Sequence, residues 1–482
     1  MKKESIMRGS PLPIKRYLYL IVERGGGILL VPFLLFLQSC AGYQPKPLDR
    51  AAVSEGLKSP DTESVIIQAK EIRHTILKPT EIDFKRGLSA DQAAVMAVIT
   101  NPSLRAERDR RGIAAAQLLQ AGILPDPTFA YSLDVPTGGN TRGTVSAYGL
   151  SLDWPLTSLI TRGAQIDAAR AQRASVDLDI AWKEWQVAES AKQLVYRLVY
   201  LEKQLSVSRE EERKLRTNLE AIQKAVGLGD MTILDLEAAE AAFQRVRASV
   251  LDVGRQSEQE KLALNSVLGL PPQYNTKLQK DIALPSAETF PPLEKIMDGL
   301  ENRRLDLIAL KMGYQSQEAN LRAAVRAQFP AISIGPSHSR DTGNVVTTGF
   351  SLSISLPFFD RNQGHIAIEK ATRQQLFDEY INRVFEARAQ AESILANMKS
   401  VEKQIDAAEK TIESLRNLVR TSYNGFLEGN IDALSYYNEL DKLFTKQLDL
   451  LKLKQDLSDF YIALEITAGR YLGQRGEKED PE

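Results

Sequence analysis

The sequence predicts a mainly helical protein with a small β part, in which one arrangement of helices and strands is repeated in tandem. Three observations predict this class. An apolar seam with heptad spacing, from Leu194 to Val226, recurs about 200 residues further along the chain, from Ile394 to Phe426. Each copy of the seam lies in a proline-free stretch, at 163–226 and 362–426. Each stretch follows runs in which apolar and polar residues alternate, which is typical of β-strands.

The composition excludes several classes of protein. With 61 Lys plus Arg against 62 Asp plus Glu, the net charge of -1 gives no general basic field for nucleic acid. The single cysteine excludes an internal disulfide and a cysteine-rich metal site. Neither His338 nor His365 has a Cys, Met or second His at ligand spacing. Without a Gly-rich phosphate loop or a plausible Ser/His/Asp set, we expect no catalytic residue, no metal and no cofactor, and therefore no enzyme.

The N-terminal region predicts a lipoprotein signal. The apolar run 28–37 follows basic residues at 15, 16 and 24 and is too short to cross a bilayer. It ends in Leu-Gln-Ser-Cys40, which resembles a bacterial lipobox. We therefore expect a signal peptide over 1–39, a lipid on Cys40 and a tether over 40–84; an ordinary signal with an incidental cysteine is the alternative. No other stretch approaches 18 apolar residues, so no transmembrane helix is expected.

The first repeat begins with a helix. Ser89 and Gln92 form a capping box, and the helix, with a break at Pro102, ends before the prolines at 125 and 127. A β-hairpin follows, with strands at 129–135 and 147–154. One face of these strands is apolar, whereas the other has small and polar residues. This pattern fits an outer-membrane barrel, and a soluble hairpin packed on a helix is the alternative.

The second repeat has the same plan. Its first strand is weaker, since Ile332 and Ile334 soon meet Gly335-Pro336, and its second strand covers 348–356. Four strands cannot close a barrel and open edges are not tolerated in lipid, so the membrane reading requires an oligomer.

A very long helix follows each hairpin. At 1.5 Å per residue each would be roughly 95–100 Å long, and the 3.5-residue period predicts supercoiled packing of helix on helix. The helices turn at Gly229 and Gly429 and return to about residues 268 and 472. The predicted divisions after the tether are a first repeat, a Pro-rich linker, a second repeat and a polar tail, at 85–268, 269–300, 301–472 and 473–482.

These features together resemble the TolC family of outer-membrane efflux and secretion channels, over about residues 85–472. The motifs are the lipobox, the duplicated plan, Asn101-Pro-Ser-Leu104 and the run from Leu356 to Gly364 (Leu-Pro-Phe-Phe-Asp-Arg-Asn-Gln-Gly). That run is similar to the segment that joins the last strand to the long helix in family members that work with heavy-metal RND pumps. The resemblance implies a homotrimer with a twelve-stranded barrel in outer-membrane lipid and an α-helical duct through the periplasm. The implied partners are a periplasmic adaptor and an inner-membrane RND transporter, and the duct itself would be passive.

In the family, acidic rings near the periplasmic tip help to gate the pore. Counted from Gly429, the two positions that are acidic in well-known members are Ser435 and Asn438 here, although the matching first-repeat position is Asp235. The candidate gate acids are therefore four residues near the turns: Asp230, Asp235, Glu428 and Asp432. The alternative is that they are solvated helix-end charges.

Three further functions compete with an efflux duct for metal cations or drugs. A type I protein secretion channel has the same architecture, because the pump selects the cargo. A periplasmic adaptor lipoprotein should have one helical hairpin flanked by β-rich domains, and two strand hairpins argue against it. A coiled-coil scaffold lipoprotein would have no pore.

Overall fold

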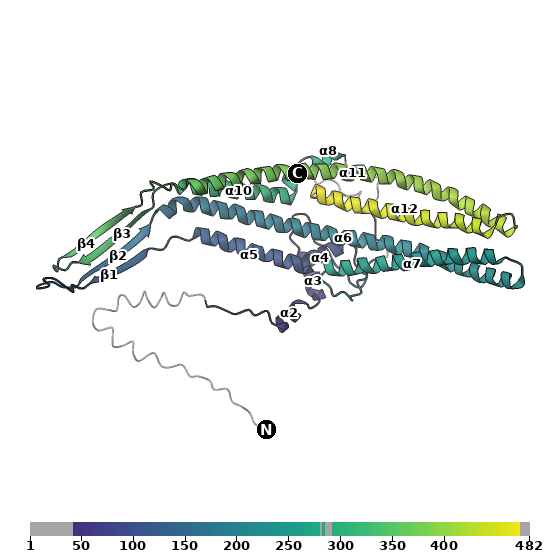
Figure 1. Cartoon of the computed structure of the whole chain (residues 1–482), viewed down its shortest axis with the longest axis horizontal. Helices are drawn as coiled ribbons and strands as arrows, with labels where there is room; N and C mark the ends of the chain where they lie inside the picture. Colours follow the sequence, from purple (N-terminus) through teal and green to yellow (C-terminus); the bar gives the residue numbers. More distant parts are fainter. Residues whose placement is uncertain (1–41, 280–281, 285–291, 473–482) are drawn as a thin grey trace, which may run out of the picture. The chain divides into compact units, whose positions relative to one another are not determined.

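The computed structural model describes residues 42–279, 282–284 and 292–472, in two units divided between Lys58 and Ser59. The described part of the first unit has one short helix, α2 (Arg50–Gly56), which Asp49 caps. Cys40 and the predicted signal peptide lie outside the described residues. All strands and long helices belong to the second unit (Figure 1).

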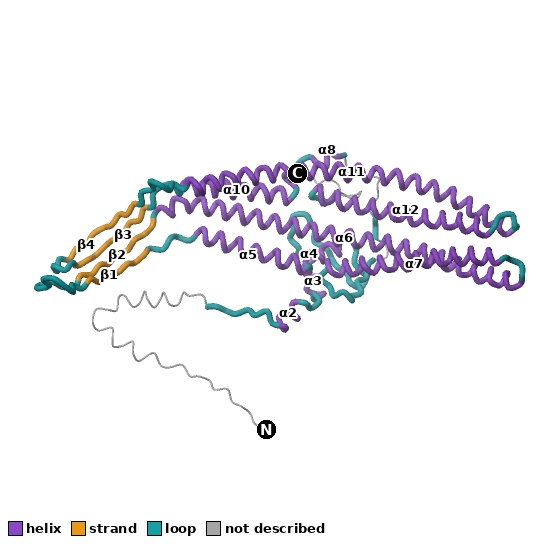
Figure 2. Tube along the Cα trace, viewed as in Figure 1, coloured by secondary structure: helices purple, strands orange, loops and turns teal. Residues whose placement is uncertain are grey.

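The second unit contains the two repeats in order, with hairpin strands between helices (Figure 2). The first half comprises α3 (Thr62–Glu71), α4 (Ala90–Thr100), α5 (Pro102–Gly122), β1 (Thr128–Asp134), β2 (Ala147–Pro155), α6 (Thr157–Leu228) and α7 (Ile233–Val267). The second half comprises α8 (Leu293–Met297), α9 (Leu300–Arg303), α10 (Leu305–Arg326), β3 (Ile332–Arg340), β4 (Val346–Ile354), α11 (Gln363–Leu427) and α12 (Ala433–Ala468). The mainly helical class with a small sheet is confirmed.

Local sequence explains where the helices begin and end. Ser89 and Gln92 form the predicted capping box of α4. The next helix starts at Pro102, where a missing N–H costs nothing, and the side chain of Asn101 caps it. The two long helices, α6 and α11, have 72 and 65 residues, so that α6 is about 108 Å long at 1.5 Å per residue.

The four strands form one antiparallel sheet in the order β1-β2-β3-β4. The pairing of β2 with β3 joins the hairpins of the two repeats, which leaves β1 and β4 as edges within the chain. The first strand of the second repeat, expected to be the weaker one because it soon meets Gly335-Pro336, continues through both residues to Arg340. Pairing with β4 runs through both residues, and the missing side chain of Gly335 lets the backbone of Leu152 approach.

The predicted seam packs as expected on the first long helix. Leu194 and Leu198 are buried in a core where α4, α6, α7 and α12 meet. Near the turns, Leu215 and Ile222 of α6 pack with Phe243 of α7 and with aromatic residues of α12. The helical hairpins of the two repeats therefore share one core near their turns, at the end opposite the sheet (Figure 1).

The segment that the sequence assigned to a tether contributes to the core of the second unit. Val65 and Ala69 of α3 and Ile82 beyond it are buried in the same cluster as α4 and α6. Just after this segment, Leu88 bridges to Leu278, which follows α7. Val65, Ala69 and Ile72 have helical spacing and were the available signal for this packing.

Candidate functional site

The sheet has two chemically different faces. The register places Phe129 opposite Leu152 and Tyr131 opposite Leu150, so the apolar side chains gather on one face. That face is open to the surroundings, since Phe129 is 65% and Phe350 is 68% exposed. The opposite face holds small and polar residues in all four strands: Ala130, Ser132, Gly149, Ser151, Asp153, Ser337, Ser339, Gly349, Ser351 and Ser353. Such a sheet can separate lipid from water.

The helices lack membrane-spanning character. Across the described ranges, none of them combines the length and the apolar composition that crossing a membrane would require.

The helical hairpins turn at the two predicted glycines. Gly229 follows α6 with φ of 84°, and Gly429 lies between α11 and α12 with φ of 74°. The Gly229 amide donates to the carbonyl of Val226, and Gly429 bonds in the same way to Phe426. Both turns therefore use the left-handed region, which costs other residues about 1–2 kcal/mol.

Replacing Gly229 or Gly429 with Ala should destabilise its own turn by about 1 kcal/mol. The cost comes from the backbone alone, because an added Cβ would meet no atom within 4 Å at either site. Hydrogen exchange of the turn amides measures this local cost. The control is Gly227→Ala, at a helical position with equally open space, where Ala should slow exchange. Equal exchange in all three variants would mean that neither turn depends on glycine.

Two of the four candidate gate acids cap helices. Asp432 accepts hydrogen bonds from the amide and the hydroxyl of Ser435, each at 2.8 Å, and these bonds lower the pKa of Asp432. Asp235 accepts from the amide of Thr232 at 2.9 Å and completes a capping box with it. The carboxylate of Glu428 accepts from the side-chain amide of Asn430 at 3.0 Å. Asp230 lies in the turn itself. All four acids therefore lie at the turns, and their action on a pore stays a prediction.

An aromatic cluster beside the second turn was missed by the sequence analysis. The rings of Phe426 and Tyr436 stack with 5.6 Å between centroids, and Tyr423 and Tyr437 lie against Tyr436. Burial raises the pKa of Tyr436 and of Tyr437 to about 12, so both phenols are neutral near pH 7. The adjacent tyrosines in the sequence were the available signal. The cluster stiffens the turn by packing α11 on α12.

Polar contacts also join the two repeats above the turns. Arg245 Nη1 of α7 lies 2.6 Å from Asp441 Oδ2 of α12. Further along, Arg197 Nε of α6 lies 3.0 Å from Asp459 Oδ2 of α12. Both are contacts between residues of different repeats, so they tie the first helical hairpin to the second.

A buried electrostatic cluster lies where α6 meets α12. Lys192 Nζ lies 2.9 Å from Glu465 Oε2, and both side chains are nearly inaccessible. Glu189, one turn before Lys192, is fully buried, and no described group donates a hydrogen bond to its carboxyl oxygens. Burial raises the pKa of Glu189 well above its usual value, with Lys192 opposing and Glu465 adding to the shift. The ion pair is therefore formed by Lys192 and Glu465, and Glu189 lies beside it with its pKa raised.

The three histidines are spread over the molecule. His74 Nδ1 accepts from the amides of Ile76 and Leu77, which places the proton on Nε2, 3.1 Å from the carbonyl of Ala181. Burial lowers the pKa of His74, so it serves as a neutral structural contact on α6. His338 lies on β3 and His365 on α11. Within the described ranges, no group of three or more His, Cys, Asp or Glu residues could hold a metal ion.

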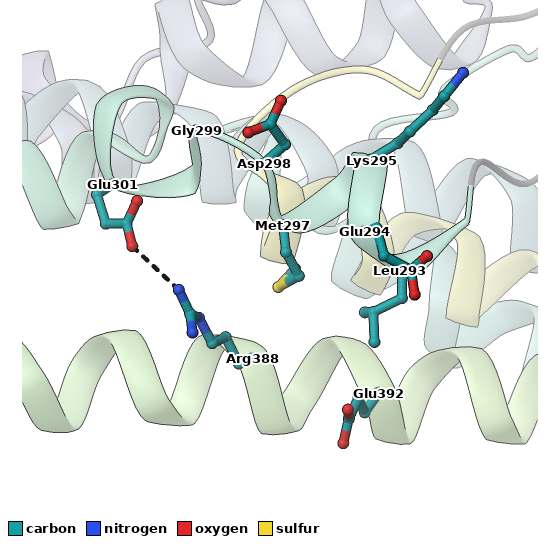
Figure 3. Close-up of a pocket in the computed structure, with 9 residues that line it drawn as sticks. All are labelled: Leu293, Glu294, Lys295, Met297, Asp298, Gly299, Glu301, Arg388 and Glu392. Atoms are coloured by element: carbon teal, nitrogen blue, oxygen red, sulfur yellow. Dashed lines mark hydrogen bonds and ion pairs between the residues drawn. The ribbon is translucent and has the colours of Figure 1, made fainter.

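A cavity of about 740 Å³ lies between the α8–α9 segment and α11 (Figure 3). The ion pair of Glu301 and Arg388 crosses it, with 3.3 Å between Oε1 and Nη2. Met297 points between the two walls (Figure 3). The walls of the cavity mix acidic, basic and apolar groups that do not converge on one point. The lining therefore indicates no specific ligand.

Comparison with known proteins assigns the architecture. The family model described as "Outer membrane efflux protein" matches residues 94–270 and 297–470. The cobalt-zinc-cadmium resistance protein CzcC of Cupriavidus metallidurans is 22% identical over 400 residues, which cover 80% of this chain and 90% of CzcC. The cation efflux system protein CusC of Escherichia coli K12 is 24% identical over 268 residues, and this match spans 52% of the chain and 56% of CusC.

A crystal structure of CusC has the same fold. It superimposes with a TM-score of 0.68 at 19% identity, covering 83% of this chain and 97% of that one. The family match covers both repeats, including the strands and the long helices. The predicted TolC-like plan is confirmed, and the chain belongs to the outer membrane efflux protein family.

Proposed function

We propose that three copies of the chain form the passive exit duct of a tripartite efflux system. The observation that supports it most is the two-faced sheet with free edges at β1 and β4. Open edges are not stable in lipid, and pairing β1 of one copy with β4 of the next closes them. Three copies of four strands then give a twelve-stranded barrel with the polar face inside.

The helices supply the periplasmic part of this duct. Helix α6 of about 108 Å, paired with α7, and the similar pair α11 and α12 reach far from the sheet. Their turns at Gly229 and Gly429 form the tip, where a periplasmic adaptor and an inner-membrane RND transporter meet the duct. The transporter supplies the energy, and the duct catalyses no reaction.

The cargo that we propose is metal cations. This rests on the similarity to CzcC, a cobalt-zinc-cadmium resistance protein, and to CusC, a cation efflux system protein. A duct passes what its pump delivers, so deleting the gene should sensitise its host to divalent cobalt, zinc or cadmium ions. Unchanged metal resistance together with lost secretion of a protein would favour the type I secretion channel instead.

We also propose that Cys40 carries a lipid that anchors the N-terminus in the outer membrane. Cys40→Ser should abolish incorporation of radiolabelled palmitate while leaving trimer assembly intact, because the closed barrel alone holds the protein in the membrane. The control is Ser39→Ala, which keeps the thiol and should keep at least part of the label. Full labelling of the Cys40→Ser protein would contradict the proposed attachment site.

A further inference from the structure

The apolar face of the sheet changes its chemistry toward the loops. The register places His338 of β3 opposite Leu150 and Arg340 opposite Tyr148. On the other side, His338 is opposite Thr348 of β4. These polar and charged groups lie on the same face as Phe129, Leu152 and Phe350, one or two residues from the strand ends. The face is therefore apolar over most of its height and basic at the loop end.

The groups at the loop end are held in place by one another. The guanidinium of Arg340 lies over the ring of Tyr148, 5.1 Å from its centroid, and Nη2 donates to the carbonyl of Ser146 at 2.8 Å. His338 Nδ1 lies 2.9 Å from Thr348 Oγ1, and its Nε2 lies 3.4 Å from the Tyr148 hydroxyl. The rings of Tyr148 and His338 are 6.0 Å apart. These contacts fix the side chains before any ligand arrives.

Arg340 keeps donors for a ligand. A guanidinium has five N–H groups, and within the described chain Ser146 takes one of them, while Nε is buried without an acceptor. The aspartates of the neighbouring strands, Asp134 and Asp153, lie on the opposite face by register. Asp341 next to Arg340 accepts from the amide of Val345 in the turn. An external anion is therefore the natural partner of Arg340.

The height of the face indicates where that anion lies. From Ile332 to Arg340 the strand rises about 27 Å, or about 20 Å after a barrel tilt of about 40°. An outer-membrane barrel has an apolar band about 25 Å tall, bounded by aromatic residues. The strand is thus a few ångströms shorter than the band, and Arg340, its last residue, covers the difference by extending its side chain toward the loops, where it meets the carbonyl of Ser146. The Arg340 guanidinium therefore reaches the level of the lipid headgroups on the side away from the helices. The phosphate group is the anion at that level, and a guanidinium binds it with two parallel hydrogen bonds.

We propose that Arg340, His338 and Tyr148 form a binding site for the phosphate of an anionic lipid in the outer leaflet, with one copy in each chain. This site rests on the proposed insertion of the sheet into the outer membrane. Arg340 binds the phosphate directly, and the ring of Tyr148, itself held by His338, keeps the guanidinium in position.

The test uses the full-length protein in neutral detergent micelles, with bisphosphorylated lipid A as the probe and the same lipid without phosphates as the reference. Native mass spectrometry measures the ratio of the two affinities. The unaltered protein should prefer the phosphorylated lipid by about tenfold, as expected for charge-assisted hydrogen bonds. Arg340→Gln should remove most of this preference, and Arg340→Lys and His338→Gln should each reduce it partly. Inorganic phosphate at the same concentration should compete only weakly.

The matched control is Arg361→Gln, which removes the same charge at the helix end of the sheet, after β4, and should keep the preference. Equal affinity for both lipids, equal losses in Arg361→Gln and Arg340→Gln, or full competition by inorganic phosphate would overturn the lipid site. Channel conductance of the unaltered protein in pure phosphatidylcholine separates this result from the proposed function. Conductance without a lipid preference would contradict only the lipid site, whereas a lipid preference without conductance would contradict only the proposed duct.

Discussion

Replacing Lys192 with Met should lower the free energy of unfolding of the assembled protein by about 3–5 kcal/mol. The side chain is 5% exposed and is paired with Glu465, which is 1% exposed. Met fills a similar volume, so the loss comes from a carboxylate left buried without its cation. Because Lys192 belongs to α6 and Glu465 to α12, the damage falls on the contact between the two repeats. Thermal or denaturant unfolding in detergent measures the change.

Two variants separate this effect from a general loss of charge. Lys224→Met changes the same residue type at an exposed position of α6 and should shift stability by no more than about 0.5 kcal/mol. Glu189→Gln removes the neighbouring carboxyl. The pKa of Glu189 is raised in the folded state, so the unfolded chain loses this proton at a lower pH than the folded protein does. The contribution of Glu189 to the free energy of unfolding is therefore greatest below about pH 4.5 and declines as the pH rises toward the raised pKa. The Gln variant should therefore flatten this decline. A Lys192→Met protein as stable as Lys224→Met would contradict the assigned ion pair.

Replacing Gly335 with Ala should prevent the sheet from forming. A Cβ built at Gly335 would lie 1.4 Å from the backbone carbonyl oxygen of Leu152, a clash that only separation of the strands relieves. Leu152 belongs to β2 and Gly335 to β3, the pair that joins the hairpins of the two repeats. The expected result is loss of the β signal in circular dichroism and loss of the heat-sensitive oligomer on gels, with the helical signal largely retained.

The control for this prediction is Gly349→Ala on the neighbouring strand β4. There an added Cβ would meet the hydroxyl of Ser337 at 3.4 Å, an ordinary contact. This variant should keep both the β signal and the oligomer. If Gly335→Ala assembled as well as Gly349→Ala, the strands would have to lie further apart at Leu152 than the structure places them.

The duplicated plan was predictable because periodicity is a local property of sequence. The heptad seam, the alternating strands and the glycine turns each need only a short window of residues. The capping roles of Asp235 and Asp432 are equally local, since Asp235 lies three residues after Thr232 and Asp432 three residues before Ser435.

The remaining features depend on contacts between distant residues. Lys192 and Glu465 are 273 residues apart, and nothing near either residue indicates its partner. Gly335-Pro336 carries a local signal for ending a strand, yet the pairing of β3 with β4 continues across it. The same holds for the basic end of the sheet, because Tyr148 and Arg340 meet only through the pairing of β2 with β3. Tertiary pairing decides these sites, and single-sequence patterns do not contain it.

We propose that copies of this chain close into a water-filled duct, and conductance of the purified full-length protein in planar lipid bilayers tests this most directly. A closed barrel with the polar face of Ser, Gly and Asp inside predicts discrete conductance steps from a preparation whose mass in detergent is that of a trimer. A monomeric preparation that inserts no conducting unit and lacks a β signal in circular dichroism would contradict the account.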